Sequence, residues 1–114
     1  LCKRYDKLCL PGALTPTEIL TAWEAGADNV KVFPADVGGP NYLKAVHGAL
    51  PQIRLLPTGG VDLTTIEAFF KAGACAVGLG SALVEKKAVD TGDVGRIKSL
   101  AEQYVAAVKK ARNK

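Results

Sequence analysis

Short apolar runs alternate along the chain with longer stretches in which apolar residues recur at helical spacing, and glycine or proline residues separate the two. The short β-branched or aromatic runs predict four strands, at 7–12, 30–33, 53–56 and 76–79. The periodic stretches predict a helical stub at 1–5 and four helices, at 15–26, 40–50, 62–73 and from about 93 to 108. Because each full helix follows a strand, the pattern is that of repeated β/α units.

The chain also contains an internal repeat, in which residues 17–30 match residues 64–77 at a spacing of 47 positions. The repeat covers a helix, the glycine that ends it, and the next strand. The matching pairs are Thr17 and Thr64, Ile19 and Ile66, Ala25 and Ala72, Gly26 and Gly73, Ala27 and Ala74, and Val30 and Val77. Repeated helix–glycine–strand units favour a parallel sheet whose strands are joined by crossover helices.

The predicted strands are apolar on both faces, which is typical of parallel strands. A complete (β/α)₈ barrel needs about 200 to 250 residues, whereas this chain has 114. We therefore predict an α/β fold with a parallel sheet, in which residues 1–114 form about half of one (β/α)₈ TIM barrel. A small, open, doubly wound sheet is the alternative.

Composition agrees with a folded, soluble domain. Hydrophobic residues make up 48% of the chain and charged residues 23%, which excludes a disordered protein. No apolar run approaches the roughly 18 residues of a membrane-spanning helix, so we predict no membrane partner. The net charge is +4. The basic segment 109–114 lacks interleaved aromatic residues, so we expect a solvated helix end and no nucleic-acid partner.

The three cysteines are an odd number without metal-ligand spacing, which indicates a reduced, intracellular chain with no metal site. We expect Cys9 and Cys75 in the core, because their neighbours are apolar. Trp23 and Tyr104 fall on apolar helical faces and are expected in the core as well.

Lys31 is the most informative polar residue, because it lies inside the predicted strand 30–33. Lysine is depleted in strands. Burial lowers the pKa of a lysine and leaves a neutral, nucleophilic amine. Such an amine can form a Schiff base with a ketone, which then accepts electrons from a breaking carbon–carbon bond. The alternative is an edge-strand lysine that faces water, and Lys31 alone favours this alternative.

Two glycine-rich strand ends, at 57–60 and 78–81, are candidate phosphate sites. Glycines allow an anion to approach backbone N–H groups closely, and a helix N-terminus beyond them adds a favourable dipole. Each segment alone is better explained as a tight turn. At equivalent ends of consecutive strands, however, the two together favour a phosphate site. We expect His47 to be a surface or packing residue and Asp36 a solvated loop carboxylate.

Three segments in order carry a resemblance to a known family: 30–35 (Val-Lys-Val-Phe-Pro-Ala), 56–61 (Leu-Pro-Thr-Gly-Gly-Val) and 78–81 (Gly-Leu-Gly-Ser). Together with Pro11-Gly12 and the segment 15–18, they resemble the 2-dehydro-3-deoxy-6-phosphogluconate (KDPG) and 4-hydroxy-2-oxoglutarate aldolases. The resemblance covers nearly the whole chain and corresponds to the C-terminal half of that family, strands 5 to 8 of the barrel.

The resemblance implies a metal-independent class I aldolase without a cofactor, which is cytoplasmic and a homotrimer. Such an enzyme cleaves a phosphorylated 2-keto-3-deoxy sugar acid to pyruvate and glyceraldehyde 3-phosphate. The resemblance also implies a role for each matching residue. It reverses the preference for interpreting Lys31 as an edge-strand lysine. Lys31 would form the Schiff base, Phe33 would lie beside it, and Thr58 would bind the carboxylate of the keto acid. The phosphate would be bound by Gly59, Gly60, Gly80 and Ser81.

The family's strands 1 to 4 have no counterpart here, and with them the glutamate that acts as general acid and base is absent. Asp36 and Glu18 are poorly placed in the sequence to replace it. A non-catalytic phosphate-binding or assembly module therefore remains an alternative, as does another phosphate-binding barrel enzyme, an isomerase or a synthase. We expect the chain to be a fragment of a longer protein; a separate chain or a second copy could also cover its open sheet.

Overall fold

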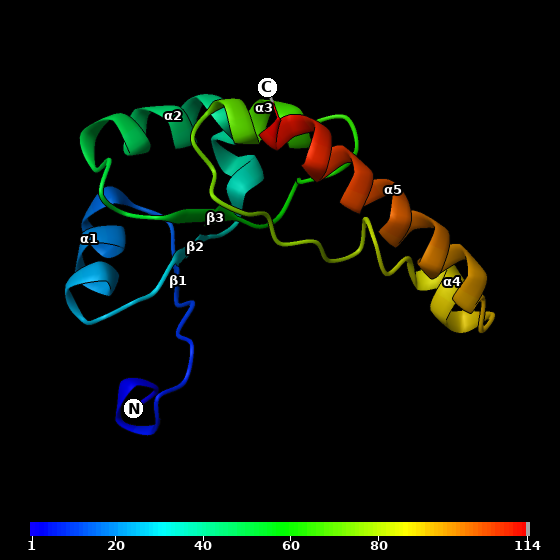
Figure 1. The fold of residues 1–114 in the computed structure, drawn as a ribbon, viewed down its shortest axis with the longest axis horizontal. Helices are drawn as coiled ribbons and strands as arrows, with labels where there is room; N and C mark the ends of the chain where they lie inside the picture. The colour runs from blue at the N-terminus through cyan, green and yellow to red at the C-terminus, as the bar shows by residue number, and fades with distance from the viewer. Residues whose placement is uncertain (114) are drawn as a thin grey trace.

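The computed structural model describes residues 1–113 and contains a three-stranded parallel sheet in the order β1-β2-β3 (Figure 1). The strands are β1 (Gly12–Ala13), β2 (Val30–Val32) and β3 (Leu55–Pro57). Lys31 is paired with Gly12 on one side and with Leu56 on the other, so β2 is the middle strand. The predicted α/β fold with a parallel sheet is confirmed.

The helices follow the strands as the sequence predicts. They are α1 (Pro16–Glu24), α2 (Gly39–Ala49), α3 (Ile66–Lys71), α4 (Lys86–Asp90) and α5 (Val94–Arg112), with 3-10 turns η1 (Lys3–Tyr5) and η2 (Ala35–Val37). Helix α1 packs on β1 and β2, α2 packs on β3, and α3 packs against both α2 and α5. Helix α5 extends past the sheet and carries α4 beside its first turns (Figure 1).

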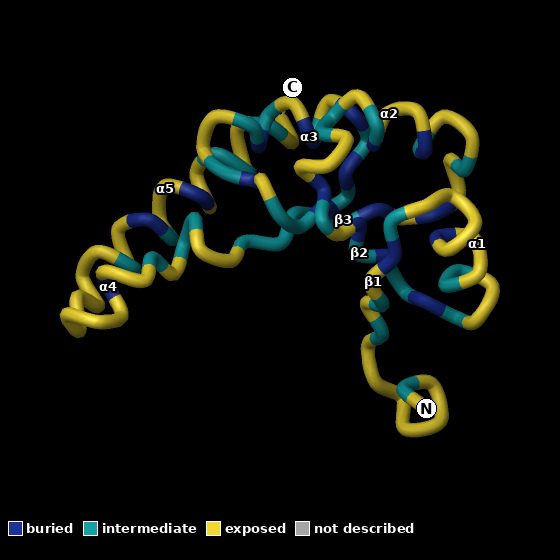
Figure 2. Tube along the Cα trace, turned by 180° about the vertical axis from the view of Figure 1, so that it is seen from behind, coloured by how far each residue is buried: buried dark blue, intermediate teal, exposed yellow. Residues whose placement is uncertain are grey.

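Only one face of the sheet is covered. Val30, Val32 and Leu55 are buried on that face, where they share a core with residues of the helices, among them Ile19, Leu43, Val46, Ile66, Phe69, Leu100 and Tyr104. On the opposite face, Lys31 and Leu56 are only half-buried. The burial colours in Figure 2 follow this division, with dark blue at the sheet and on the helices and yellow at the N-terminal turn.

Two predicted strands are shorter than expected. The strand predicted at 7–12 is limited to β1, because β1 is an edge strand and has only β2 to pair with. The strand predicted at 76–79 is reduced to a single bridge between Thr58 and Gly78. The backbone nevertheless runs beside β3, since the Cys75 and Gly78 N–H groups donate to Leu55 and Pro57. Two such hydrogen bonds are too few to extend the bridge into a strand.

Two helix predictions also needed correction. The helix predicted from Asp62 begins at Ile66, because the Asp62 carboxylate accepts hydrogen bonds from the Thr64 and Thr65 N–H groups and holds residues 62–65 in a turn. Helix α4 was not predicted; its first and last residues, Lys86 and Asp90, form an ion pair of 2.6 Å. The stub predicted at 1–5 is the short 3-10 turn η1.

Helix α1 begins with the predicted capping box. The Thr15 hydroxyl accepts from the Glu18 N–H, and the Glu18 carboxylate accepts from the Thr15 N–H. Replacing Thr15 with alanine removes the N-terminal acceptor, and we expect a loss of about 1 kcal/mol in the free energy of unfolding. Urea denaturation measures this loss. Thr17→Ala is the matched control and should leave stability nearly unchanged. Thr17 is exposed on the same helix, and its hydroxyl forms no hydrogen bond among the described residues.

Candidate active site

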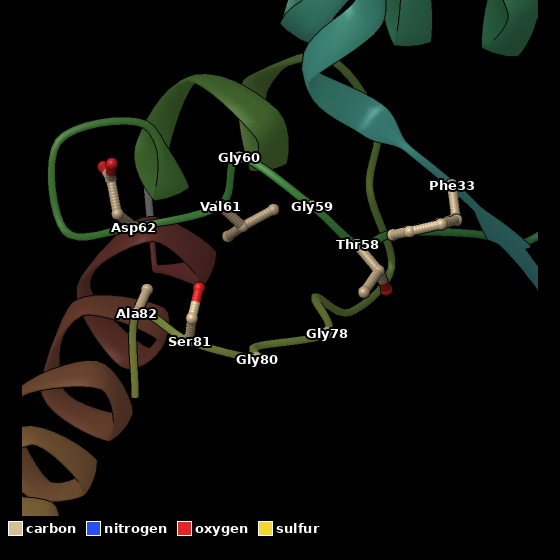
Figure 3. Close-up of a pocket in the computed structure, with 10 residues that line it drawn as sticks. All are labelled: Phe33, Thr58, Gly59, Gly60, Val61, Asp62, Gly78, Gly80, Ser81 and Ala82. Carbon is tan, nitrogen blue, oxygen red and sulfur yellow. The ribbon is translucent and has the colours of Figure 1, made fainter. Parts of the chain in front are cut away.

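A cavity of about 420 Å³ opens where the carboxyl ends of β2 and β3 and the bridged segment at Gly78 meet (Figure 3). In parallel α/β sheets this edge is where ligands bind. Six of the seven predicted site residues line the cavity, namely Phe33, Thr58, Gly59, Gly60, Gly80 and Ser81. Val61, Asp62, Gly78 and Ala82 complete its lining. Segments separated by more than 40 positions in the sequence thus meet in one site.

Lys31 lines a neighbouring cavity of about 360 Å³, and Phe33 lines both. The Lys31 Nζ lies 5.0 Å from the centre of the Phe33 ring, within the range of a cation–π contact. No carboxylate among the described residues lies within 4.0 Å of this amine. Because β2 is the middle strand, Lys31 is not an edge-strand lysine, and that alternative is wrong.

Glu18 lines the same cavity as Lys31. Its carboxylate accepts hydrogen bonds from the N–H and the hydroxyl of Thr15. These two bonds hold the pKa of Glu18 below its usual value. A carboxyl group with a lowered pKa is a poor proton donor near neutral pH, so the geometry agrees with Glu18 serving as a helix cap.

Close backbone approach explains the glycines of the larger cavity. Gly60 has a φ of +71°, and a Cβ atom at this residue would lie 2.3 Å from the Cβ of Asp36. A Cβ atom at Gly78 would lie 2.2 Å from the Thr58 hydroxyl oxygen. No side chain fits at either position without displacing its neighbour. Glycine at 60 therefore lets the end of β3 approach the segment that follows β2, and glycine at 78 lets the bridged segment approach Thr58.

Several hydrogen-bonding groups of the cavity have no partner among the residues that the structure describes. The backbone N–H groups of Gly59, Gly60, Gly80 and Ser81 donate to no acceptor among the described residues. The Thr58 hydroxyl is buried and also lacks a partner among them. A buried, unpaired hydroxyl is costly, and an anion that accepts from these groups would remove that cost.

Asp62 is the acidic residue in the lining of the larger cavity. Hydrogen bonds from the hydroxyl and the N–H of Thr64 are the main causes that hold its pKa below the usual value of 3.8. The pKa of Asp62 is thus lower in the folded state than in the unfolded chain. Ionised Asp62 therefore stabilises the fold at any pH above the usual carboxyl pKa. This stabilisation is lost as the pH falls through the lowered pKa.

We therefore expect Asp62→Asn to lower the free energy of unfolding at neutral pH. In acid, the difference in this free energy between the variant and the unmodified chain should become smaller. Urea denaturation of both proteins at neutral pH and well below pH 4, about the usual carboxyl pKa, measures this. A gap that stays constant across that range would show that the Asp62 charge is not the cause.

The other candidates are structural. The His47 ring packs against Gly73, where a Cβ atom would lie 2.5 Å from its Cδ2, so of the two predicted roles, surface or packing, the structure shows packing. Tyr104 is buried as expected, whereas Trp23, Cys9 and Cys75, which were predicted in the core, are only half-buried. Among residues 1–113, no group of three or more histidine, cysteine or acidic side chains could hold a metal ion. Over the same residues, no helix has the length and hydrophobicity to cross a membrane.

Comparison with known proteins gives a family match over most of the chain. Residues 1–100 match the family model described as KDPG and KHG aldolase. The 2-dehydro-3-deoxy-6-phosphogalactonate aldolase of Escherichia coli (strain K12) is 41% identical over 80 residues, which are 69% of this chain and 39% of that enzyme. The chain thus spans less than half the length of this relative.

Solved structures agree with this match. The native structure of KDPGal superposes with a TM-score of 0.86 at 34% identity, over 98% of this chain and 53% of that one. A chain of a cube-shaped, porous protein cage, designed by fusing symmetric oligomeric domains, gives the same TM-score and identity over 97% of this chain and 40% of that one.

Proposed function

Because the chain belongs to the KDPG and KHG aldolase family, we propose that it is the part of a class I aldolase that carries the Schiff-base lysine. The parent enzyme would be a carbon–carbon lyase that cleaves a phosphorylated 2-keto-3-deoxy sugar acid to pyruvate and glyceraldehyde 3-phosphate. In this proposal Lys31 is the nucleophile, Phe33 lies beside it, and Thr58 binds the carboxylate of the keto acid. The phosphate is bound by Gly59, Gly60, Gly80 and Ser81.

We further propose that residues 1–114 are the C-terminal half of a single (β/α)₈ barrel, strands 5 to 8. Two features support this. Helices cover one face of the sheet and leave the face of Lys31 and Phe33 open. The open face would correspond to the inner face of a barrel, which is covered only when the remaining strands close the barrel. The chain also spans 39% and 53% of the two natural relatives described above. A homo-oligomer, a trimer in the cytoplasm, is the proposed assembly, and the similar chain in a cage built from oligomeric domains supports an oligomer.

The proposed reaction begins when the neutral amine of Lys31 attacks the ketone carbon of the substrate. Loss of water from the carbinolamine gives a protonated Schiff base, which withdraws electrons from the adjacent bonds. A base then removes the proton of the C4 hydroxyl, the C3–C4 bond breaks, and the aldehyde leaves. The remaining enamine takes up a proton at C3, and hydrolysis releases pyruvate and the free lysine.

The proton transfers require a positioned acid and base, which contribute about 10² to 10⁴-fold to rate. Lys31 has no carboxylate close by among the described residues, and Glu18 is engaged as a helix cap. We therefore assign the acid and base to the half of the barrel that this chain lacks. The chain alone should form the adduct with pyruvate but turn over substrate slowly.

The position of Lys31 carries the proposal, since a lysine on the middle strand faces the open side of the sheet beside the larger cavity. The test is to incubate the full chain with pyruvate and sodium borohydride and to measure its intact mass. We expect a single reduced adduct. Trypsin cannot cleave after a modified Lys31, so the adduct should appear in a peptide of residues 8–44 in place of 8–31.

A non-catalytic phosphate-binding module is the second candidate. Four N–H groups around the cavity have no acceptor among residues 1–113, which favours it. No described carboxylate within 4.0 Å of Lys31 can act as its acid or base, which favours it as well. Such a module would bind inorganic phosphate and form no reducible adduct with pyruvate. A folded chain that gives this pair of results would replace the aldolase proposal.

A further inference from the structure

The hydroxyl of Tyr42 forms a long-range hydrogen bond beside the cavity of about 360 Å³ that Lys31 lines. Tyr42 lies on α2, the helix that follows β2, and its hydroxyl donates to the carbonyl of Leu14 at 2.5 Å. Leu14 belongs to the loop between β1 and α1, 28 positions earlier in the sequence. Because Leu14 lines the cavity of Lys31, Tyr42 is bonded to a wall of the proposed Schiff-base site.

The carbonyl of Leu14 lies just beyond the end of the backbone ladder. Pairing of β1 with β2 ends at Ala13, whose carbonyl accepts from the Phe33 N–H at 3.1 Å. Bonds to one neighbour recur at every second residue of a parallel strand, so the next donor would be Ala35. The Ala35 N–H instead donates to the Thr58 carbonyl, on the side of β3. No backbone N–H among the described residues donates to the Leu14 carbonyl, and the tyrosine hydroxyl is its donor.

Glycine at position 38 leaves room for this tyrosine. A Cβ atom at Gly38 would lie 2.3 Å from the Cβ of Tyr42 and 2.6 Å from its Cγ. Both distances are far shorter than van der Waals contact, so a side chain at position 38 would displace the tyrosine. The φ of Gly38 is −119°, which other residues adopt as well. Space for the Tyr42 ring is therefore the reason for glycine here.

We propose that Tyr42 is a positioning residue for the Lys31 site, an inference that rests on the proposed function. Its hydroxyl fixes the wall formed by Leu14, so that a keto acid meets the amine of Lys31 in one orientation. Tyr42 itself lines neither this cavity nor the larger one, so it acts through Leu14 and is not a catalytic residue. Without the hydroxyl, the wall is held less firmly, and ordering it on binding weakens the affinity for the keto acid.

The test measures how formation of the reducible adduct depends on pyruvate concentration. The full chain and Tyr42→Phe are equilibrated with increasing pyruvate and treated briefly with borohydride, and their intact masses are measured. We expect both proteins to reach the same final extent of labelling. Tyr42→Phe should need about 2- to 10-fold more pyruvate for half of that extent, the effect of one lost hydrogen bond.

Tyr104→Phe is the matched control. Tyr104 is buried on α5 and lines neither cavity, so its variant should keep the half-saturating concentration of the unmodified chain. An equal rise in Tyr104→Phe would trace the effect to a general loss of stability and would overturn the positioning role.

The remaining outcomes separate this inference from the proposed function. If the unmodified chain is labelled and Tyr42→Phe has the same half-saturating concentration, the positioning role is wrong and Lys31 remains the nucleophile. A lower urea midpoint of Tyr42→Phe, together with that unchanged concentration, would show that the hydrogen bond is merely structural. If the folded, unmodified chain is not labelled at any pyruvate concentration, the aldolase proposal is wrong, and the role of Tyr42 is overturned with it.

Discussion

Replacing Lys31 with methionine should abolish the borohydride-dependent labelling of the chain by pyruvate. Methionine is nearly as long as lysine and suits the half-buried face of the sheet, but it has no amine to attack a carbonyl. We therefore expect the signal of the adduct to fall to background, and circular dichroism to show an unchanged fold. Intact mass after incubation with pyruvate and borohydride measures the effect.

Lys44→Met is the matched control, because Lys44 lies exposed on α2, away from the cavities. It should be labelled as fully as the unmodified chain. If labelling instead persisted in Lys31→Met and mapped to another lysine, Lys31 would not be the nucleophile.

Gly60→Ala should be the most disruptive single-methyl change at the site. Two costs add at this position. The φ of +71° is one that alanine adopts at a cost of about 1 to 2 kcal/mol. The new Cβ would also lie 2.3 Å from the Cβ of Asp36, and overpacking of this kind costs about 1 to 3 kcal/mol. We expect the free energy of unfolding to fall by about 2 to 5 kcal/mol, as measured by urea denaturation.

Gly39→Ala separates the two costs. Gly39 also has a positive φ, of +64°, but a Cβ atom there meets nothing within 4 Å. It should lose only the backbone contribution of about 1 to 2 kcal/mol. Equal losses at the two glycines would mean that the contact with Asp36 is relieved at no cost and that its close approach does not require glycine at position 60.

The local parts of the structure follow from the sequence. The capping box at Thr15 and Glu18 and the helix that begins after Asp93 are set by neighbouring residues, and both form as expected. The meeting of the two glycine-rich strand ends was also predictable, because the carboxyl ends of parallel strands share one edge of a sheet. The roles of the residues at this edge remain predictions from the family resemblance.

Two of the features that the sequence did not show depend on pairing between distant segments, and a third is local. Whether Lys31 lies on an edge or in the middle depends on which strands flank β2, and no local pattern shows that. The bridge at Gly78 looked like a full strand because Ala76 to Leu79 are apolar, yet among the described residues this segment is tied to β3 by only two backbone hydrogen bonds, from Cys75 to Leu55 and from Gly78 to Pro57. At Asp62 the carboxylate binds the N–H groups of a turn, and the sequence alone did not separate that turn from the first turn of the helix.

The strand order also bears on how the chain folds. Each strand of the described sheet pairs with the strand before or after it in the sequence, in the order β1-β2-β3. Pairing between successive units closes shorter loops than pairing between distant strands would, and a lower contact order favours faster folding. Structure can therefore grow one β/α unit at a time, in the manner of a repeat protein. The amide protons of β2, which has a neighbour on both sides, should then exchange with solvent more slowly than those of β1.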